Sequence, residues 1–169
     1  MPHDALATAN KLLDLADARD LQITHMGLHK VLYFAHGWHL AAHGGPLIDQ
    51  PFAAWKHGPV LRPVWEAFKA AQRAPIRSRG KKFDPVNRVW SPAREPFSAE
   101  DERLLGAVLA GYGHLDAIAL SRMTHRSGGA WDRVWNAPAG RINVGMTIPD
   151  ALILEDFRTV PSMGVAGRS

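Results

Sequence analysis

The chain has 169 residues, of which 46% are hydrophobic and 21% are charged, and it contains no cysteine. This composition is typical of one globular domain and excludes a disordered or fibrous chain. The lack of cysteine excludes disulfides, thiolate metal sites and cysteine nucleophiles. The longest apolar stretch, around residues 31–42, is shorter than the roughly 20 apolar residues that span a membrane. The first residues show no secretory pattern, so we expect a cytoplasmic protein without a membrane partner.

The positive charge is concentrated in one segment. The net charge of the chain is +4, and residues 73–94 hold seven basic residues against the single Asp84, hence +6. The rest of the chain therefore carries −2. Such a segment can dock an acidic protein or a phosphate backbone, or it is only a solvated loop. Its basic residues are Arg73, Arg77, Arg79, Lys81, Lys82, Arg88 and Arg94.

Two helices are predicted near the N-terminus. Asp4 can cap a helix over residues 5–18, in which apolar residues recur at helical spacing. Thr24 can cap a second helix over residues 25–43, which ends at the glycine pair 44–45. This second helix is apolar around most of its circumference, which is typical of a central helix that contacts several others.

The middle of the chain is predicted to be more irregular. The pattern over residues 47–56 indicates a loop and a short extended piece, followed by a turn at 57–59. Pro59 suits the first turn of a third helix, which we expect to continue to about Gln72. Further on, prolines and glycine break the pattern, and apolar residues within 83–91 predict a short strand or hairpin beneath a basic loop.

The last part of the chain is predicted to be helical again. Ser98 and Asp101 resemble a capping box that opens a helix. Another helix is expected over residues 114–124, and a last one from Ile148 through Phe157. The predicted fold class is therefore mainly α (α+β), a compact helical domain with a small β-hairpin or short strands around 47–56 and 83–91. We expect a single domain over residues 1–157 and a mobile C-terminal tail over residues 158–169.

Five of the nine histidines lie in the second predicted helix. The pairs His25/His29 and His39/His43 have the i, i+4 spacing that can chelate one metal ion. However, no Glu follows the first histidine of either pair, and no third ligand is evident. We therefore expect no metal site and no cofactor, and we interpret His29, His36 and His39 as packing and hydrogen-bonding residues.

Catalytic patterns are also missing from the sequence. There is no Gly-x-Ser-x-Gly elbow and no glycine-rich phosphate loop. Ser121, His125 and Asp116 lie on one predicted helix, and side chains on one helix rarely reach the geometry of a catalytic triad. We therefore expect a protein that is not an enzyme.

Several segments together resemble a known family of bacterial antitoxins, the SocA-like family with the Panacea domain, which also includes GepA-like proteins. The resemblance covers about residues 5–157. The segments that carry it are ANKLLDLA at 9–16, MGLHKVLYFAHGWHLA at 26–41, AWKHGPV at 54–60, SRMTHRSGGAW at 121–131 and IPDALILEDF at 148–157. Residues of the structural signature are Tyr33, His36, Trp38, Gly58, His125 and Trp131.

The resemblance implies an antitoxin that binds a cognate protein toxin and neutralises it. Similarity to the SocA-like branch implies a proteolytic adaptor that delivers the toxin to ClpX of the ClpXP protease, whereas simple sequestration is the alternative. The sequence departs from the family pattern at His29, where Gln is more common, and at His57, where an aromatic residue is common. Gly128 and Gly129 replace more polar residues, so details of the surface differ from the family pattern.

Two segments are candidates for partner binding. The turn Trp55–Val60 places an aromatic residue and a cation on a rigid segment, as protein interfaces often do. Alternatively, Trp55 is a core residue and Gly58–Pro59 only begins a helix. The basic segment is the other candidate, either for a protein or for a nucleic acid as a DNA-binding regulator. The candidate contact residues are Trp55, Lys56, His57, Pro59, Arg77, Arg79, Lys81, Lys82 and Arg88.

Overall fold

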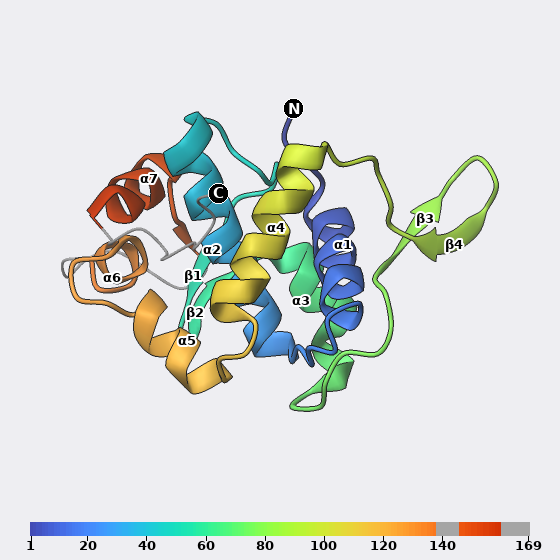
Figure 1. The fold of residues 1–169 in the computed structure, drawn as a ribbon, viewed down its shortest axis with the longest axis horizontal. Helices are drawn as coiled ribbons and strands as arrows, with labels where there is room; N and C mark the ends of the chain where they lie inside the picture. Colours follow the sequence, from blue (N-terminus) through green and yellow to red (C-terminus); the bar gives the residue numbers. More distant parts are fainter. Residues whose placement is uncertain (138–145, 160–169) are drawn as a thin grey trace.

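The computed structural model describes residues 1–137 and 146–159, and it shows a mainly α chain with short antiparallel strands (Figure 1). This fold class confirms the prediction from the sequence. The helices are α1 (Ala5–Asp17), α2 (His25–His43), α3 (Arg62–Phe68), the 3₁₀ turn η1 (Lys69–Ala71), α4 (Ala99–Tyr112), α5 (Ala117–Thr124), α6 (Ala130–Trp135) and α7 (Asp150–Thr159). The strands are β1 (Ala53–Trp55), β2 (Gly58–Val60), β3 (Lys81–Asp84), β4 (Val89–Pro92) and β5 (Met146–Thr147).

The first two helices begin and end where local chemistry predicts. The Asp4 carboxylate accepts a hydrogen bond from the Ala7 amide at the start of α1, and the Thr24 hydroxyl accepts one from Gly27 at the start of α2. Helix α2 ends at Gly44, whose φ of 73° is the left-handed conformation that glycine adopts without strain. Local capping is therefore sufficient to set the limits of these helices.

Helix α2 is the centre of the fold. It packs against α1, α3, α4, α5 and α7 and against β2, and residues 27–37 are all buried. The buried apolar residues from Ala5 in α1 to Phe157 in α7 form one cluster around it. The view in Figure 1 shows α1 and α4 on one side of this helix and α6 and α7 on the other.

The small sheet has the strand order β2-β1-β5 and is antiparallel. Pro59 lies in β2 opposite Ala54, and α3 begins only at Arg62, so the prediction that Pro59 opens a helix is wrong. The physical reason is that β2 is an edge strand, where the missing N–H of a proline does not interrupt a ladder. Instead, Pro63 occupies the first turn of α3.

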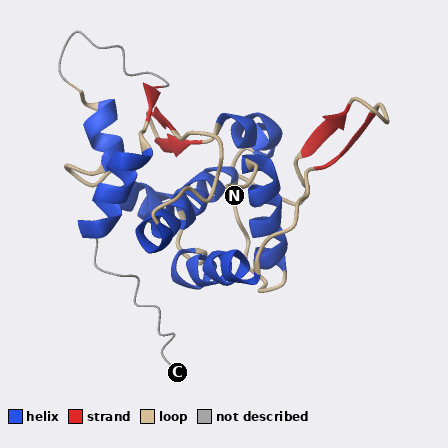
Figure 2. Cartoon of the chain, turned by 90° about the horizontal axis from the view of Figure 1, so that it is seen from above, coloured by secondary structure: helices blue, strands red, loops and turns tan. Residues whose placement is uncertain are grey.

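Strands β3 and β4 form a separate hairpin that projects from the body beside α1 (Figures 1 and 2). We call residues 81–92 the hairpin arm. The predicted hairpin is confirmed, but its place beneath a basic loop is wrong, because the basic residues belong to the arm itself and to its base. No second layer of the described structure covers the arm, so apolar residues within it are exposed.

The C-terminal helices depart from the prediction in several places, among them α6, which is a helix where the sequence indicated only a short turn. Helix α5 begins after Asp116, which accepts a hydrogen bond from the Ala119 amide, and not at residue 114. Helix α7 continues to Thr159, two residues beyond the predicted end, with Ile153 and Phe157 buried as expected. The predicted mobile tail began at residue 158, but Arg158 and Thr159 belong to α7, and residues 160–169 lie outside the described residues.

Candidate protein-binding surfaces

The turn between β1 and β2 presents two side chains to solvent. Lys56 and His57 are exposed, whereas Trp55 is half-buried and Pro59 is buried. The Trp55 ring packs edge-on against Trp65, with a centroid distance of 5.0 Å. Of the four residues predicted to contact a partner here, only Lys56 and His57 are therefore fully accessible, and Trp55 offers one edge of its ring.

The backbone of this turn is held from inside by a buried lysine. Lys30 of α2 has no exposed surface, and its ammonium group donates a hydrogen bond of 2.8 Å to the His57 carbonyl. Burial lowers the pKa of Lys30 to about 8, because a charge is costly to desolvate. The sequence analysis did not select Lys30, although a lysine flanked by apolar residues on a helix that is apolar all round was a visible signal.

The segment at residues 121–131, which belongs to the family pattern, holds the same turn from the other side. The Trp131 indole donates a hydrogen bond of 2.7 Å to the Trp55 carbonyl. Its ring stacks on His125, with centroids 3.9 Å apart and an angle of 11° between the planes. Gly58 has a φ of 121°, and a side chain there would also meet Thr124 and His125. These residues shape the turn, and none of them is free to meet a partner.

The other signature residues are internal. Tyr33 is buried among aromatic rings, with its ring edge-on to Phe52 at 5.3 Å. His36 accepts a hydrogen bond from the Ile48 amide and donates one of 2.8 Å to Asp150, which ties the loop after α2 to the start of α7. The Trp38 indole donates to the Tyr112 hydroxyl at 3.0 Å. These contacts explain why the α2 segment carries so many polar aromatic residues.

The histidine pairs of α2 make hydrogen bonds within the chain. His29 Nδ1 accepts from the Leu61 amide, so its Nε2 carries the proton and donates to His25 Nε2 at 3.1 Å. His39 Nδ1 donates to the Gly45 carbonyl at 2.7 Å. Over residues 1–137 and 146–159, no group of three potential ligands is placed to hold a metal ion.

The basic segment is partly neutralised by acidic residues of the N-terminal region. Arg79 pairs with Asp14 and Asp17 of α1, and Arg94 also pairs with Asp14. Lys82 pairs with the cap residue Asp4 in the same way. Among the seven basic residues of this segment, those that form no ion pair with the described part of the chain are Arg73, Arg77, Lys81 and Arg88. The free positive charge is thus about half of what the sequence alone indicates.

A hollow lies beside the exposed turn. Its volume is about 580 Å³, and its lining includes His57, Arg73, Met26 and Ile118. Ile118 is 67% exposed, which is a large exposed fraction for an apolar side chain. We call this hollow the turn groove. It combines an apolar floor with the positive charge of Arg73, which suits a protein ligand.

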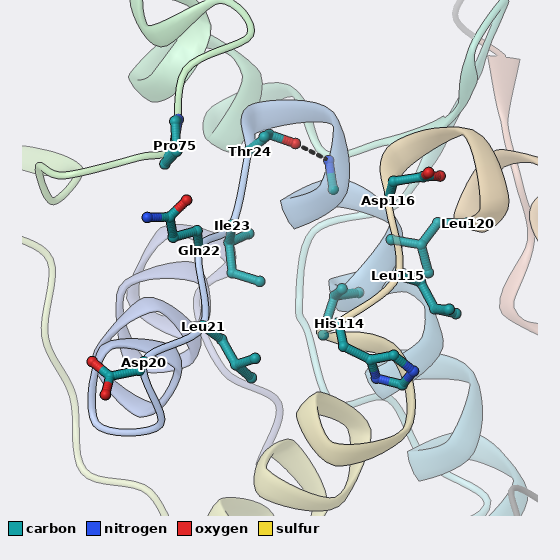
Figure 3. A pocket seen from close by; sticks show the side chains of 13 residues that line it. Asp20, Leu21, Gln22, Ile23, Thr24, Pro75, His114, Leu115, Asp116 and Leu120 are labelled. Atoms are coloured by element: carbon teal, nitrogen blue, oxygen red, sulfur yellow. Dashed lines mark hydrogen bonds between the residues drawn. The ribbon is translucent and has the colours of Figure 1, made fainter.

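A smaller cavity of about 340 Å³ adjoins the turn groove at Thr24. Figure 3 shows Leu21 and Ile23 from the loop after α1 on one side, and His114 and Leu115 from the connection between α4 and α5 on the other. The dashed line marks the cap hydrogen bond from Gly27 to Thr24. The polar side chains that line this cavity come from separate loops, and they form no pattern of nucleophile and base.

The antitoxin SocA-like, Panacea domain family model matches residues 28–132, a range that includes the turn, the hairpin arm and the Trp131 contact. The chain belongs to the SocA-like antitoxin family. The protein "Antitoxin SocA" of Caulobacter vibrioides (strain NA1000 / CB15N) is 37% identical to it over 155 residues, which is 92% of this chain and 82% of the relative. No solved structure matches the chain significantly.

Membership of the SocA-like antitoxin family implies a toxin as the partner. No single helix among the described residues is long and apolar enough to cross a membrane. Helices α4 and α5 together have the length and composition of a membrane span, but the two helices are bent by 108° relative to each other. In this SocA-like chain, most of the signature residues hold the turn and the core, while the exposed candidates lie at the turn, on the hairpin arm and, for Arg77, just before the arm.

One consequence of the buried His25–His29 pair is a loss of stability in mild acid. Burial, together with His25 and Lys30, holds the pKa of His29 well below 6.5. Below pH 6.5 the unfolded chain binds this proton and the folded chain does not, so the free energy of unfolding falls as the pH falls. The slope approaches about 1.4 kcal/mol per pH unit for one such group. Urea unfolding at pH 7.5, 6.5 and 5.5 measures it.

The control for this prediction is His29→Gln, which keeps an acceptor for the Leu61 amide and cannot titrate. As the pH falls below 6.5, the free energy of unfolding should fall less for His29→Gln than for the native chain. Ion pairs of other histidines cancel in the comparison. Parallel pH profiles for the two proteins would contradict the proposed role of His29.

Proposed function

We propose that this chain binds a cognate protein toxin directly and neutralises it, and that it does so as a proteolytic adaptor that delivers the toxin to ClpX of the ClpXP protease. The observation that carries the proposal is the match to the SocA-like antitoxin family, together with 37% identity to a curated antitoxin over 92% of the chain. We also propose that the protein acts by binding and not by catalysis.

The arrangement of the surfaces supports an adaptor. Such a protein has to contact its substrate and the protease at the same time, so it needs two separate surfaces. The turn groove, with His57 and Ile118, lies beside α5, whereas the hairpin arm projects beside α1 (Figure 1). A weak contact with the protease is sufficient when the substrate is bound tightly, because a tethered complex has a high effective concentration.

The decisive experiment measures the half-life of the toxin, taken as the product of the adjacent open reading frame, in cells with and without ClpXP. With the chain present, we expect a half-life several-fold shorter in cells that contain ClpXP and unchanged or longer in cells that lack it. Cells without the chain are the control. A toxin that binds and is stabilised in both cell types favours sequestration, and failure of the two proteins to bind contradicts the proposed function.

A DNA-binding regulator is the alternative function, and the charge of the basic segment favours it. The ion pairs of Arg79, Lys82 and Arg94 with N-terminal acids reduce the charge available to phosphates. A functional nucleic-acid contact requires an affinity that drops steeply as salt increases. An affinity for duplex DNA that is absent, or independent of salt, would remove this alternative.

A further inference from the structure

The hairpin arm has two faces that can be told apart by its register. Phe83 pairs with Trp90 across the strands, and Lys82 pairs with Ser91. Because side chains alternate along a strand, Phe83 and Trp90 lie on the face opposite to Lys82. Lys82 binds Asp4 at the start of α1, so its face is the one turned toward the body. The aromatic pair therefore lies on the outer face of the arm.

The outer face exposes large apolar side chains. Trp90 is 63% and Phe83 is 48% exposed, and their ring centroids are 5.5 Å apart. Val86 at the tip is exposed as well, whereas the exposed Val89 lies on the opposite face, because it alternates with Trp90 along β4. Large clusters of exposed apolar residues are rare on soluble proteins and usually mark interaction sites. Tryptophan is enriched among the residues that contribute most of the binding energy at interfaces.

The charges around this aromatic pair are positive. Lys81 and Arg88 are exposed, and within the described ranges neither forms an ion pair. The one acid of the arm, Asp84, accepts hydrogen bonds from the Val86 and Asn87 amides and from the Asn87 side chain. These bonds lower the pKa of Asp84 and keep its carboxylate within the loop. An apolar centre with a positive rim is complementary to an acidic protein surface.

The base of the arm is fixed to α1. Asn10 is fully buried, and its side chain donates to the carbonyls of Gly80 and Ala93 and accepts from the Gly80 amide. The Ala93 amide also donates to the Gly80 carbonyl at 2.9 Å, which closes the base. A hairpin held in a fixed direction loses less entropy on binding than a mobile loop does.

From these observations we infer that the outer face of the hairpin arm is the docking site for the toxin, and that Phe83 and Trp90 enter an apolar depression with an acidic rim on the toxin surface. The inference rests on the proposed function. The two exposed aromatic rings and the loss of three basic residues to ion pairs favour a protein over a nucleic acid as the ligand.

The test measures binding of the purified product of the adjacent open reading frame to the full chain and to variants. Trp90→Ala should weaken binding by at least tenfold, and Phe83→Ala should act in the same direction. Lys81→Glu with Arg88→Glu should slow association and flatten its dependence on salt. Met123→Ala removes an exposed apolar residue of α5 that lines neither the turn groove nor the arm, and it should leave the affinity unchanged. Thermal unfolding checks that the arm variants remain folded.

The outcomes of this test distinguish a wrong docking site from a wrong proposed function. If the native chain binds the toxin and Trp90→Ala binds it equally well, the docking site is wrong and the antitoxin role stands. Loss of self-association or of single-stranded DNA binding in Trp90→Ala, with toxin binding unchanged, also overturns the inference. If the native chain does not bind the toxin, the proposed function itself fails.

Discussion

Replacing Asn10 with Ala should lower the free energy of unfolding by roughly 3 kcal/mol, because buried groups lose their partners and each costs about 1–3 kcal/mol. The Asn10 side chain makes three hydrogen bonds to the base of the hairpin arm, and all three are buried. Alanine leaves the Gly80 amide without its acceptor, and no water can easily reach this site. A better helix propensity of Ala in α1 offsets only about 0.5 kcal/mol of this loss.

Chemical denaturation of the native chain and of Asn10→Ala measures this effect. The matched control is Asn87→Ala, which removes an exposed asparagine from the tip of the same arm and should change the stability by about 0.5 kcal/mol or less. If the two variants are equally stable, the base of the arm is not held by Asn10, and the argument that the arm has a fixed direction fails with it.

Replacing Gly37 with Ala should destabilise the protein by about 2 kcal/mol through overpacking, although alanine is the better helix former by about 1 kcal/mol. Gly37 lies in the middle of α2, where a Cβ atom would overlap the ring of Phe157 in α7. That ring is buried against Phe34 and Trp38, so it has no space to move. The glycine therefore lets α7 approach the central helix.

A second glycine provides the control with the opposite sign. Gly106 in α4 is also buried, but an added Cβ would meet only the end of the flexible Arg19 side chain, at 2.7 Å. Gly106→Ala should thus be neutral or stabilising by up to about 1 kcal/mol. In a double-mutant cycle, Gly37→Ala should cost less when Phe157→Ala is already present. Equal effects of the two glycine substitutions on urea unfolding would contradict this packing argument.

The sequence was a good guide wherever local chemistry decides. Asp4, Thr24 and Ser98 cap helices as predicted, because a cap needs only a side chain and an amide a few residues away. The prediction for Pro59 was wrong because proline suits both a first helical turn and an edge strand. Only the pairing with Ala54 in the folded sheet distinguishes the two.

The candidate contact residues were likewise predicted only in part. The sequence selected Lys56 and His57, which are exposed, but also Pro59, which is buried. It missed Lys30, since the burial of a lysine depends on the helices packed around it. It also placed Phe83 and Trp90 in a strand without indicating that they face solvent.

By itself, the sequence determined the two N-terminal helices, the central position of the histidine-rich segment and the resemblance to an antitoxin family, because these depend on caps, periodicity and residue order. Only the tertiary structure decided which basic residues pair with α1 and which stay free. It also decided that Lys30 lies beneath the turn and that the aromatic pair of the arm has no covering layer. Exposure is a property of what packs against a segment, and residues distant in the sequence supply that packing.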